Sequence, residues 1–368
     1  DGFREIFVTT ERDEPDILFY NNGDGTFTNI SEAAGILDKA WSMGAVFADI
    51  NMDGWLDIYV INYIKDPDAI IDQETGDVTG FSHTCFHNFL YINQGDLTFT
   101  ESAAQYGLND NGCGLAVTAS DFDGDGLPDL YVANDFGEWI LPNRVFRNDF
   151  PATSFTEISE AYKLNDEVFG MSIATGDYDR NGMLDYYISN IGRNVLHKRT
   201  ADADFIDITD EAGVACAEVE GLNSTSWGSA FLDVDNDGYE DLFVANGYIP
   251  SAKFIETSKT DPDKLFHNNH DGTFSEISSM AGIGYEGISR GMGYTDFDQD
   301  GDLDIILNVT QRVLYNPENI KLYENHLDNG NHWLKLFMEG VDVNRDAYGA
   351  RVAAYSGQAL FLRELSSS

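Results

Sequence analysis

The sequence predicts an all-β fold, a β-propeller, from a repeated loop, repeated flanking strands and an unusual content of turn formers. Five loops share the pattern Asp-x-Asp/Asn-x-Asp/Asn-Gly-x-x-Asp and start at residues 49, 121, 177, 233 and 296. A strand of small residues that includes Gly precedes each loop, and an apolar strand such as Leu130-Tyr131-Val132 follows it. The 35 Gly and only 8 Pro favour short strands joined by turns.

Each repeat is expected to contain a strand, a loop, a strand, a hairpin and a strand. Asp-Gly turns within Tyr20–Phe27 and Phe266–Phe274 indicate the hairpin. One such unit cannot bury its own apolar faces, whereas blades packed around an axis can. Residues 1–8 match the end of a loop and the strand after it, so six units are visible and the first is cut. We therefore expect further residues upstream in the parent protein.

The charge balance excludes some classes of partner. The chain has 64 acidic and 21 basic residues, a net charge of −43. Nucleic acids and anionic membrane surfaces are bound through Lys and Arg patches, so neither is expected as a partner. Hydrophobic residues make up 42% of the chain, which argues against disorder. No apolar run approaches the roughly 18 residues that indicate a membrane-spanning helix.

The five loops are predicted calcium sites. Ca²⁺ takes six to eight oxygen ligands, which side chains at loop positions 1, 3, 5 and 9 and a backbone carbonyl at position 7 supply, while Gly at position 6 permits the turn. Zinc is disfavoured because His and Cys are absent from the loops. The candidate ligands are Asp49, Asn51, Asp53, Trp55, Asp57, Asp121, Asp123, Asp125, Leu127, Asp129, Asp177, Asp179, Asn181, Met183, Asp185, Asp233, Asp235, Asp237, Tyr239, Asp241, Asp296, Asp298, Asp300, Asp302 and Asp304.

Two other interpretations of the loops are less consistent with the sequence. EF-hands need Glu at position 12, where this chain has apolar residues such as Val60 and Leu307. Asp-Gly turns also form without metal, but five copies in register favour ligation. A truncated sixth site is expected at Asp1 and Glu5. The calcium ions are expected to stabilise the blades, so the partner-binding surface should lie elsewhere.

The three cysteines leave two alternatives open. A Cys85–Cys113 disulfide is favoured because both residues lie in the same repeat region, and three unpaired buried thiols are the alternative. His83, Cys85 and His87 alternate along one strand and could hold a transition metal. The plainer interpretation is one disulfide cysteine flanked by two surface histidines.

Two further motifs were considered. Gly287-Ile-Ser289-Arg-Gly291 fits the Gly-x-Ser-x-Gly nucleophile pattern, but the strand and calcium loop expected after it do not suit a nucleophile elbow. Tryptophans stack on sugars in some binding proteins, although blade packing is the expected role of most of them here. The tryptophans are Trp41, Trp55, Trp139, Trp227 and Trp333.

The repeat resembles a known family. The small-residue strand, the loop and the following Asp129-Leu-Tyr-Val resemble the FG-GAP (VCBS) repeat of integrin α-subunit propellers, and more closely the cartilage acidic protein family and its bacterial relatives. Gly330-Asn-His-Trp-Leu-Lys-Leu336 and Asn344-Arg-Asp-Ala-Tyr-Gly-Ala-Arg-Val352 are similar to the start of the ASPIC/UnbV module. The resemblance implies a secreted or cell-surface, calcium-binding propeller of seven blades. Here six units are visible, and the chain stops at Ser368 within the module pattern.

The expected domains are a propeller over residues 1–330 and a partial ASPIC/UnbV-like β-module over residues 331–368. The expected function is non-enzymatic: calcium-dependent extracellular adhesion, scaffolding or protein assembly, on the cell surface, in the matrix or, in bacteria, in the periplasm or on the outer surface. A carbohydrate-binding propeller is the first alternative, and a polysaccharide-processing enzyme is the second. The expected partners are proteins or glycans.

Overall fold

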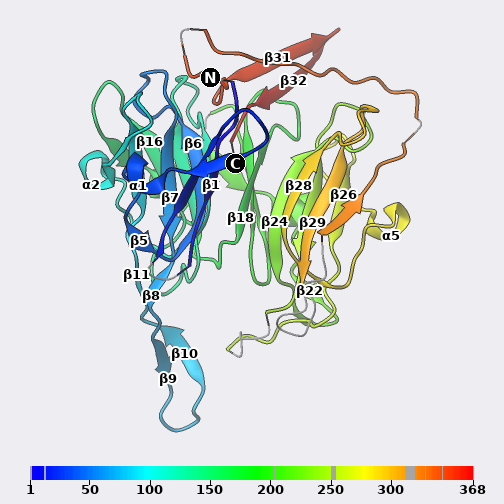
Figure 1. The fold of residues 1–368 in the computed structure, drawn as a ribbon. Coiled ribbons are helices and arrows are strands. Elements are labelled where there is room, and N and C mark those ends of the chain that lie inside the picture. The colour runs from blue at the N-terminus through cyan, green and yellow to red at the C-terminus, as the bar shows by residue number, and fades with distance from the viewer. Residues whose placement is uncertain are drawn as a thin grey trace. The chain divides into compact units, whose positions relative to one another are not determined.

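A computed structural model describes residues 2–11, 14–202, 204–249, 254–310, 320–327, 329–341 and 343–367. The chain divides into two compact units, each described by itself below. Unit 1 comprises Asp1–Gly170, Phe337–Arg351 and Glu364–Ser368, and unit 2 comprises Met171–Leu336 and Val352–Arg363. Three antiparallel blade sheets belong to each unit, drawn as arrows in Figure 1.

In unit 1 the first described blade has three strands and the next two have four. The first is β1 (Ile6–Val8), β3 (Ile17–Asn21) and β4 (Phe27–Asn29). The second is β6 (Ser42–Ala48), β7 (Asp57–Asn62), β12 (Phe89–Asn93) and β13 (Phe99–Glu101). The third is β14 (Gly114–Ser120), β15 (Asp129–Asn134), β16 (Arg144–Asn148) and β17 (Phe155–Glu157).

In unit 2 two blades have four strands, and the last has three described strands. The fourth blade is β18 (Ser172–Gly176), β19 (Asp185–Ser189), β20 (Val195–Arg199) and β21 (Phe205–Asp207). The fifth is β24 (Ser226–Leu232), β25 (Asp241–Asn246), β26 (Lys264–Asn268) and β27 (Phe274–Glu276). The sixth is β28 (Ile288–Thr295), β29 (Asp304–Thr310) and β30 (Ile320–Tyr323).

Shorter elements surround the blades. The short strand pairs are β2 (Glu14–Pro15) with β5 (Lys39–Ala40), β8 (Ile64–Asp66) with β11 (Thr84–Cys85), β9 (Ala69–Ile71) with β10 (Val78–Phe81), β22 (Glu218–Val219) with β23 (Leu222–Asn223), and β31 (Arg351–Ser356) with β32 (Ala359–Glu364). The helices are α1 (Ser31–Ala34), α2 (Ala103–Tyr106), α3 (Ser159–Tyr162), α4 (Thr209–Ala212) and α5 (Ser278–Ala281). No described helix is long and apolar enough to cross a membrane.

The hydrophobic core lies between consecutive blades of a unit. The second strands β7, β15 and β25 are buried at every residue, because neighbouring sheets cover both of their faces. In unit 1, Tyr59 of β7 and Leu130 of β15 belong to one buried cluster. In unit 2, Tyr187 of β19 and Leu242 of β25 belong to another. Each blade therefore depends on its neighbour for burial, as the repeat pattern predicts.

The predicted fold class is confirmed, because the described chain is all-β and contains six propeller-type blades. The sequence analysis did not anticipate the one-turn helix that follows the outermost strand of the first five blades. Four of these helices end at a glycine with positive φ, such as Gly35 at 82°. Asp1 of the truncated loop lies outside the described residues. The seventh blade and the boundary at residue 330 remain predictions.

An aromatic cluster surrounds a buried carboxyl group in unit 1. The Tyr63 hydroxyl donates a hydrogen bond of 2.5 Å to Asp135, and the Tyr63 ring stacks on Phe136 at 6.5 Å between centroids. Phe136 has a φ of 59°, in the left-handed region that bulky residues rarely adopt. Burial raises the pKa of Asp135 from 3.8 to about 7.

This raised pKa predicts a specific pH dependence of folding. Below pH 3.8 the Asp135 carboxyl is protonated in both states, and as the pH rises towards about 7 the folded protein retains a proton that the unfolded chain loses. The stability gained from that proton is lost as the pH rises through about 7. We expect Asp135→Asn to lose less stability than the wild type between pH 5 and 8, measured by urea unfolding. Parallel pH profiles for the two proteins would contradict this assignment.

Candidate metal centres in the blade loops

All five predicted loops connect the first and second strands of a blade. Each first Asp follows the end of the first strand directly, as Asp49 follows β6. Each ninth-position Asp begins the second strand and is at most 2% exposed. These ninth-position residues are Asp57, Asp129, Asp185, Asp241 and Asp304. The fold therefore places the same two acidic positions at the same end of all five blades.

The ninth-position carboxylate binds two backbone segments of its blade. In the second blade, one oxygen of Asp57 accepts from the N–H of Ile50 in the loop at 3.0 Å, and the other accepts from the N–H of Asn93 in β12 at 2.8 Å. In the other blades the last residue of the third strand, or in the sixth blade Asn325 two residues beyond it, donates the corresponding bond at 2.7–2.8 Å. Except in the third loop, the second oxygen accepts from a loop N–H, so the loop is attached to its second and third strands.

The loop backbone is left-handed at position 6, as expected, and also at position 4, which was not expected. The position-6 glycines have φ between 85° and 101°, where a residue with a Cβ would be strained. Position 4 is also left-handed, even where it is not Gly, as at Met52 (57°) and Arg180 (58°). Through these turns the N–H groups of Asp53 and Gly54 each reach one oxygen of Asp49 at 2.9 Å. The loop is therefore shaped around its first carboxylate.

Acidic oxygens converge in four of the loops. In each of the second to fifth loops, oxygens of three Asp residues lie within 4.8 Å of one another. The groups are Asp121, Asp123 and Asp129; Asp177, Asp179 and Asp185; Asp233, Asp235 and Asp237; and Asp296, Asp298 and Asp300. The first loop has the amide Asn51 at the position of one of these acids. Oxygen-only donor sets of this kind suit hard cations such as Ca²⁺.

The third loop provides the clearest test of whether a cation fits. One oxygen of Asp177 and one of Asp185 are buried without a hydrogen-bond partner among the described residues. Their side chains belong to the same converging group as Asp179. A buried carboxylate oxygen without a donor is costly, and a bound divalent cation would satisfy both oxygens at once. The residues present therefore fit a calcium ion. The carbonyl ligands at position 7 remain a prediction.

Burial opposes ionisation of these carboxyl groups in the absence of metal. It raises the pKa of Asp57 to about 7 and that of Asp129 to about 8. The pKa values of Asp177 and Asp233 are raised to about 6 for the same reason. The pKa of Asp185 is raised well above its usual value. A cation in the loop would reverse this effect, since a nearby positive charge favours the carboxylate form.

Basic side chains also reach the loops, which the sequence analysis did not foresee. Lys198 Nζ of β20 lies 2.5 Å from Asp179 Oδ2 in the third loop. Lys335 Nζ lies 3.3 Å from Asp296 Oδ2 in the fifth. Neither basic residue lies within a loop, so the loop pattern alone could not reveal the contacts. These two ammonium groups neutralise part of the negative charge of the third and fifth loops.

Part of the C-terminal segment packs on the second loop in unit 1. The Arg351 guanidinium donates to the carbonyl of Asp121, lies 3.5 Å from the Asp121 carboxylate and contacts Glu364 Oε1 at 3.2 Å. Glu364 in turn accepts from the Asp121 N–H at 3.0 Å and from the Ser120 hydroxyl at 2.6 Å. Arg351 and Glu364 thus bind the loop on its backbone and on its carboxylate. Beside them is a cavity of about 230 Å³, lined by residues that include Tyr348.

The other candidate residues have mostly structural roles. Cys85 forms the predicted disulfide with Cys113, so it is not available to a metal with His83 and His87. The motif serine Ser289 is fully buried in β28 and donates to Asp263 at 2.9 Å, so the structure does not support a nucleophile elbow there.

The tryptophans divide into packed and exposed groups. Trp41 packs on Tyr63 with ring centroids 5.2 Å apart, Trp139 packs on Phe81 at 5.4 Å, and Trp227 donates to the carbonyl of Gly247 at 2.8 Å. These three support the predicted packing role. Trp55 and Trp333 are 53% and 51% exposed, respectively.

Comparison with known proteins identifies the repeat. The FG-GAP-like repeat family matches residues 1–60, 77–132, 121–188 and 233–307, which together exceed half of the chain. The chain belongs to the FG-GAP-like repeat family. All five loops lie wholly within these segments.

Individual relatives share part of the sequence or part of the fold. Cartilage acidic protein 1 of Homo sapiens is 27% identical over 227 residues, covering 56% of this chain and 32% of that protein. The Xenopus tropicalis protein of the same name is 25% identical over 283 residues, covering 72% and 39%. This chain thus spans about a third of the length of these relatives. An Agrocybe aegerita lectin specific for non-reducing terminal N-acetylglucosamine is similar at a TM-score of 0.42 and 15% identity, covering 88% of this chain and 80% of that one.

Calcium should stabilise the fold through the unpaired oxygens of the third loop. At a calcium concentration of about ten times Kd, one site adds about 1.4 kcal/mol. We expect Asp185→Asn to remove about that much of the stability that calcium adds. In chelator the free energy of unfolding should change little, because an amide replaces a buried carboxyl of similar shape. Denaturant unfolding with calcium and with chelator measures both quantities.

The exposed Asp202→Asn in the same blade is the matched control, and it should keep the full calcium effect. An Asp185→Asn protein with an undiminished calcium response would contradict the assignment of the third loop.

Arg351 should hold the C-terminal segment against the second loop. Its replacement by Ala leaves Glu364 and Asp121, which are 4% and 8% exposed at their side chains, without their cationic partner. We expect Arg351→Ala to cost about 1–3 kcal/mol and to speed proteolysis of the last residues of unit 1. Mass spectrometry of timed digests detects the new cleavage. Arg345→Ala removes an exposed ion pair with Glu339 and should leave the digestion pattern unchanged.

Proposed function

We propose that this protein is a calcium-stabilised extracellular binding protein that acts in adhesion, scaffolding or protein assembly. The carrying observation is the pair of buried, unpartnered carboxylate oxygens of Asp177 and Asp185, within a loop that recurs in five blades. Sites at this position support the blades rather than form a reaction centre. Extracellular calcium modules typically bind at about 10⁻⁴–10⁻³ M, where extracellular calcium keeps them filled.

The extracellular assignment is supported by the disulfide between Cys85 and Cys113. Disulfides persist in oxidising compartments and are rare in the cytosol. The strongly acidic composition is consistent with the abundant calcium of such compartments. We also propose that residues 331–368 belong to an ASPIC/UnbV-like module.

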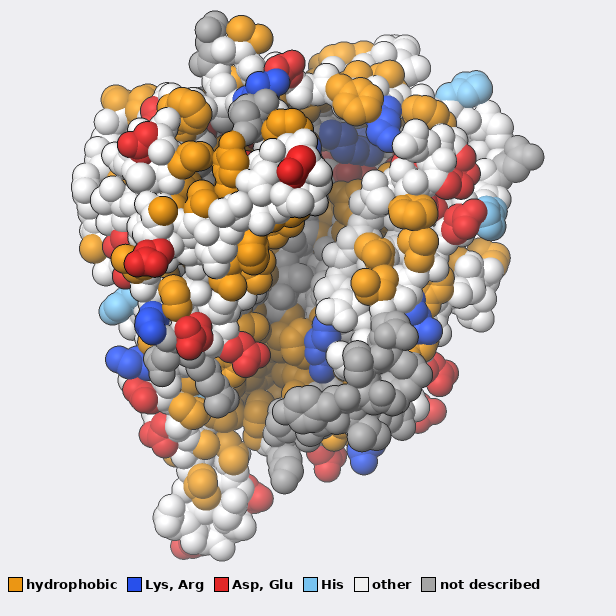
Figure 2. Space-filling view, viewed as in Figure 1, with side chains coloured by type: hydrophobic (Ala, Val, Ile, Leu, Met, Phe, Trp, Pro, Cys, Tyr) orange, Lys and Arg blue, Asp and Glu red, His pale blue; other side chains and the backbone are white. Residues whose placement is uncertain are grey.

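The partner surface is proposed at the blade end opposite the calcium loops. Because the strands are antiparallel, the connection from the second to the third strand lies at that end. In the second blade this connection carries the hairpin β9–β10, which projects at the foot of Figure 1. Ile70 and Ile71 of the hairpin are 50% and 49% exposed. Figure 2 shows hydrophobic side chains together with acidic ones on this projection, a mixture that suits a protein partner.

Carbohydrate binding is the second candidate. The observation that favours it is Trp55, half exposed at position 7 of the first calcium loop, where an aromatic face could stack on a sugar ring.

The test uses the whole chain immobilised through a terminal tag. We expect proteins from an extracellular-matrix extract to be retained in calcium and released by chelator, with less retention on the double variant Ile70→Asp/Ile71→Asp. Retention that persists in chelator, or that the double variant leaves unchanged, would count against the proposal. Binding on a glycan array that Trp55→Ala abolishes would establish the carbohydrate alternative instead.

A further inference from the structure

The fourth loop differs from the other four in the side chain that faces it. In the five blades with a loop, a different residue precedes the one whose N–H reaches the ninth-position Asp. These preceding residues are Ile92, Arg147, Lys198, His267 and Glu324. Among these five, only His267 can donate a nitrogen lone pair to a metal ion.

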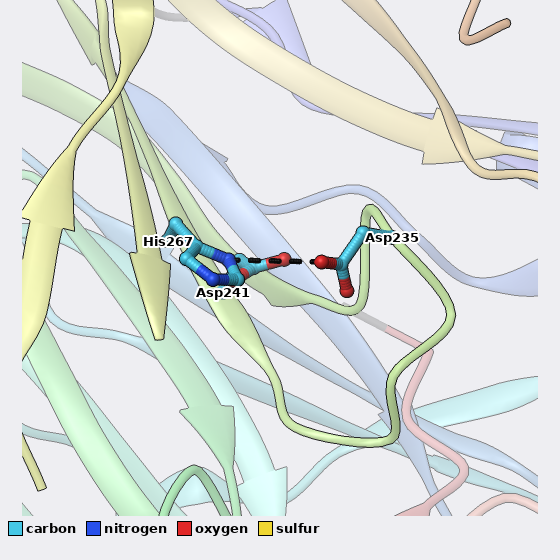
Figure 3. A group of neighbouring side chains, drawn as sticks. All are labelled: Asp235, Asp241 and His267. Atoms are coloured by element: carbon cyan, nitrogen blue, oxygen red, sulfur yellow. Dashed lines mark hydrogen bonds and ion pairs between the residues drawn. The ribbon is translucent and has the colours of Figure 1, made fainter. Parts of the chain in front are cut away.

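We propose that the fourth loop is a transition-metal site that takes Zn²⁺ through His267, Asp235 and Asp241. His267 Nδ1 lies 3.1 Å from Asp241 Oδ1 and 3.9 Å from Asp235 Oδ2, and the three ligand atoms lie within 4.8 Å of one another. Figure 3 shows the imidazole of β26 directed at both carboxylates. Two ligands at about 2.0–2.1 Å from a tetrahedral Zn²⁺ lie about 3.3 Å apart, so small adjustments complete the geometry.

The charge and accessibility of this cluster also suit zinc. Two carboxylates and one neutral imidazole balance the 2+ charge of the ion and leave a fourth position for water or a further ligand. Asp241 is buried and held by the N–H groups of Val234 and Asn268, which fixes one ligand in place. The His267 side chain is 33% exposed, so a hydrated ion can reach it from solvent.

A second imidazole lies at the rim of the site. His270 Nε2 contacts Asp237 Oδ2 of the same loop, and its ring stacks on Tyr239 at 4.1 Å between centroids. The two imidazole rings are 6.2 Å apart. A cavity of about 310 Å³, lined by Tyr239, Asn268 and His270 among others, opens beside them.

The third loop provides a natural comparison within the chain. There Lys198 occupies the place of His267 and lies 2.5 Å from Asp179, the counterpart of Asp235. A lysine ammonium neutralises the carboxylate but has no lone pair for a metal. The two loops thus differ in whether the residue from the third strand is a fixed cation or a ligand. Zinc at the fourth loop would displace calcium from Asp235 and Asp241 while leaving the other calcium loops unaffected.

The test follows Co²⁺, a spectroscopic substitute for Zn²⁺, in excess calcium with a chain that lacks a polyhistidine tag. We expect one equivalent to bind with the intense visible absorption of tetrahedral cobalt, and Zn²⁺ to displace it. His267→Gln should weaken binding at least tenfold, whereas His326→Gln, at an exposed position, should not. The 15N resonance of His267 Nδ1, rather than Nε2, should shift when Zn²⁺ is added.

A gain-of-function variant keeps the proposal testable if His267→Gln folds poorly. Lys198→His places an imidazole beside Asp179 and Asp185, and we expect it to create a second cobalt site in the third loop. Equal cobalt binding by the wild type and His267→Gln, or no second site in Lys198→His, would overturn the proposal. Calcium-dependent stability is measured on the same samples, so failure of the zinc site is distinguishable from failure of the proposed calcium function.

Discussion

The structure of the second to sixth blades depends on a buried aspartate at the start of the second strand. In four of them its two oxygens accept from a loop N–H and from an N–H at or just beyond the end of the third strand, as those of Asp129 do, so one side chain joins three segments. This geometry fixes the loop, and with it the direction in which the other acidic side chains point. The same aspartate carries an electrostatic cost, because burial disfavours its charge. Each loop therefore needs compensation by protons, cations or basic side chains.

The blades meet this need in different ways. The third loop combines unpaired carboxylate oxygens with Lys198, the fourth has His267, and the second is bound by Arg351. A backbone donor at or just beyond the third strand recurs in the second to sixth blades, whereas the compensating side chain differs between them. A common architecture can thus hold loops with different affinities for cations. The same reasoning explains why a net charge of −43 is compatible with a folded chain.

Sequence analysis predicted what is local to the loop. It found the ligand spacing, the position-6 glycines, the strands on either side and the Cys85–Cys113 pair, because each follows from short-range pattern or proximity. It missed His267 because the separation between the ninth-position Asp and its third-strand partner varies from 14 to 36 residues among the blades. No fixed spacing marks that residue. It also disfavoured zinc because the loops contain no His or Cys, and it did not consider nitrogen donors from the neighbouring strands. The left-handed Met52 and Arg180 were missed because neither residue type favours that conformation.

The sequence separation between the ninth-position Asp and its third-strand partner varies between blades, and this indicates how the two ends of a blade differ in role. The loop end contains the first-to-second and third-to-fourth connections, which are short and closely repeated. Substitutions there disturb the converging carboxylates and the attachment of the loop to its strands. The opposite end contains the second-to-third connection, where the hydrogen-bonded partners of the second blade are 36 positions apart in sequence and a disulfide holds the connection. The second-to-third connection can change in length without altering the buried aspartate or its backbone donors. A repeat of this design can diversify its partners at one end while the other end keeps the blades folded, which is why we place recognition opposite the metal loops.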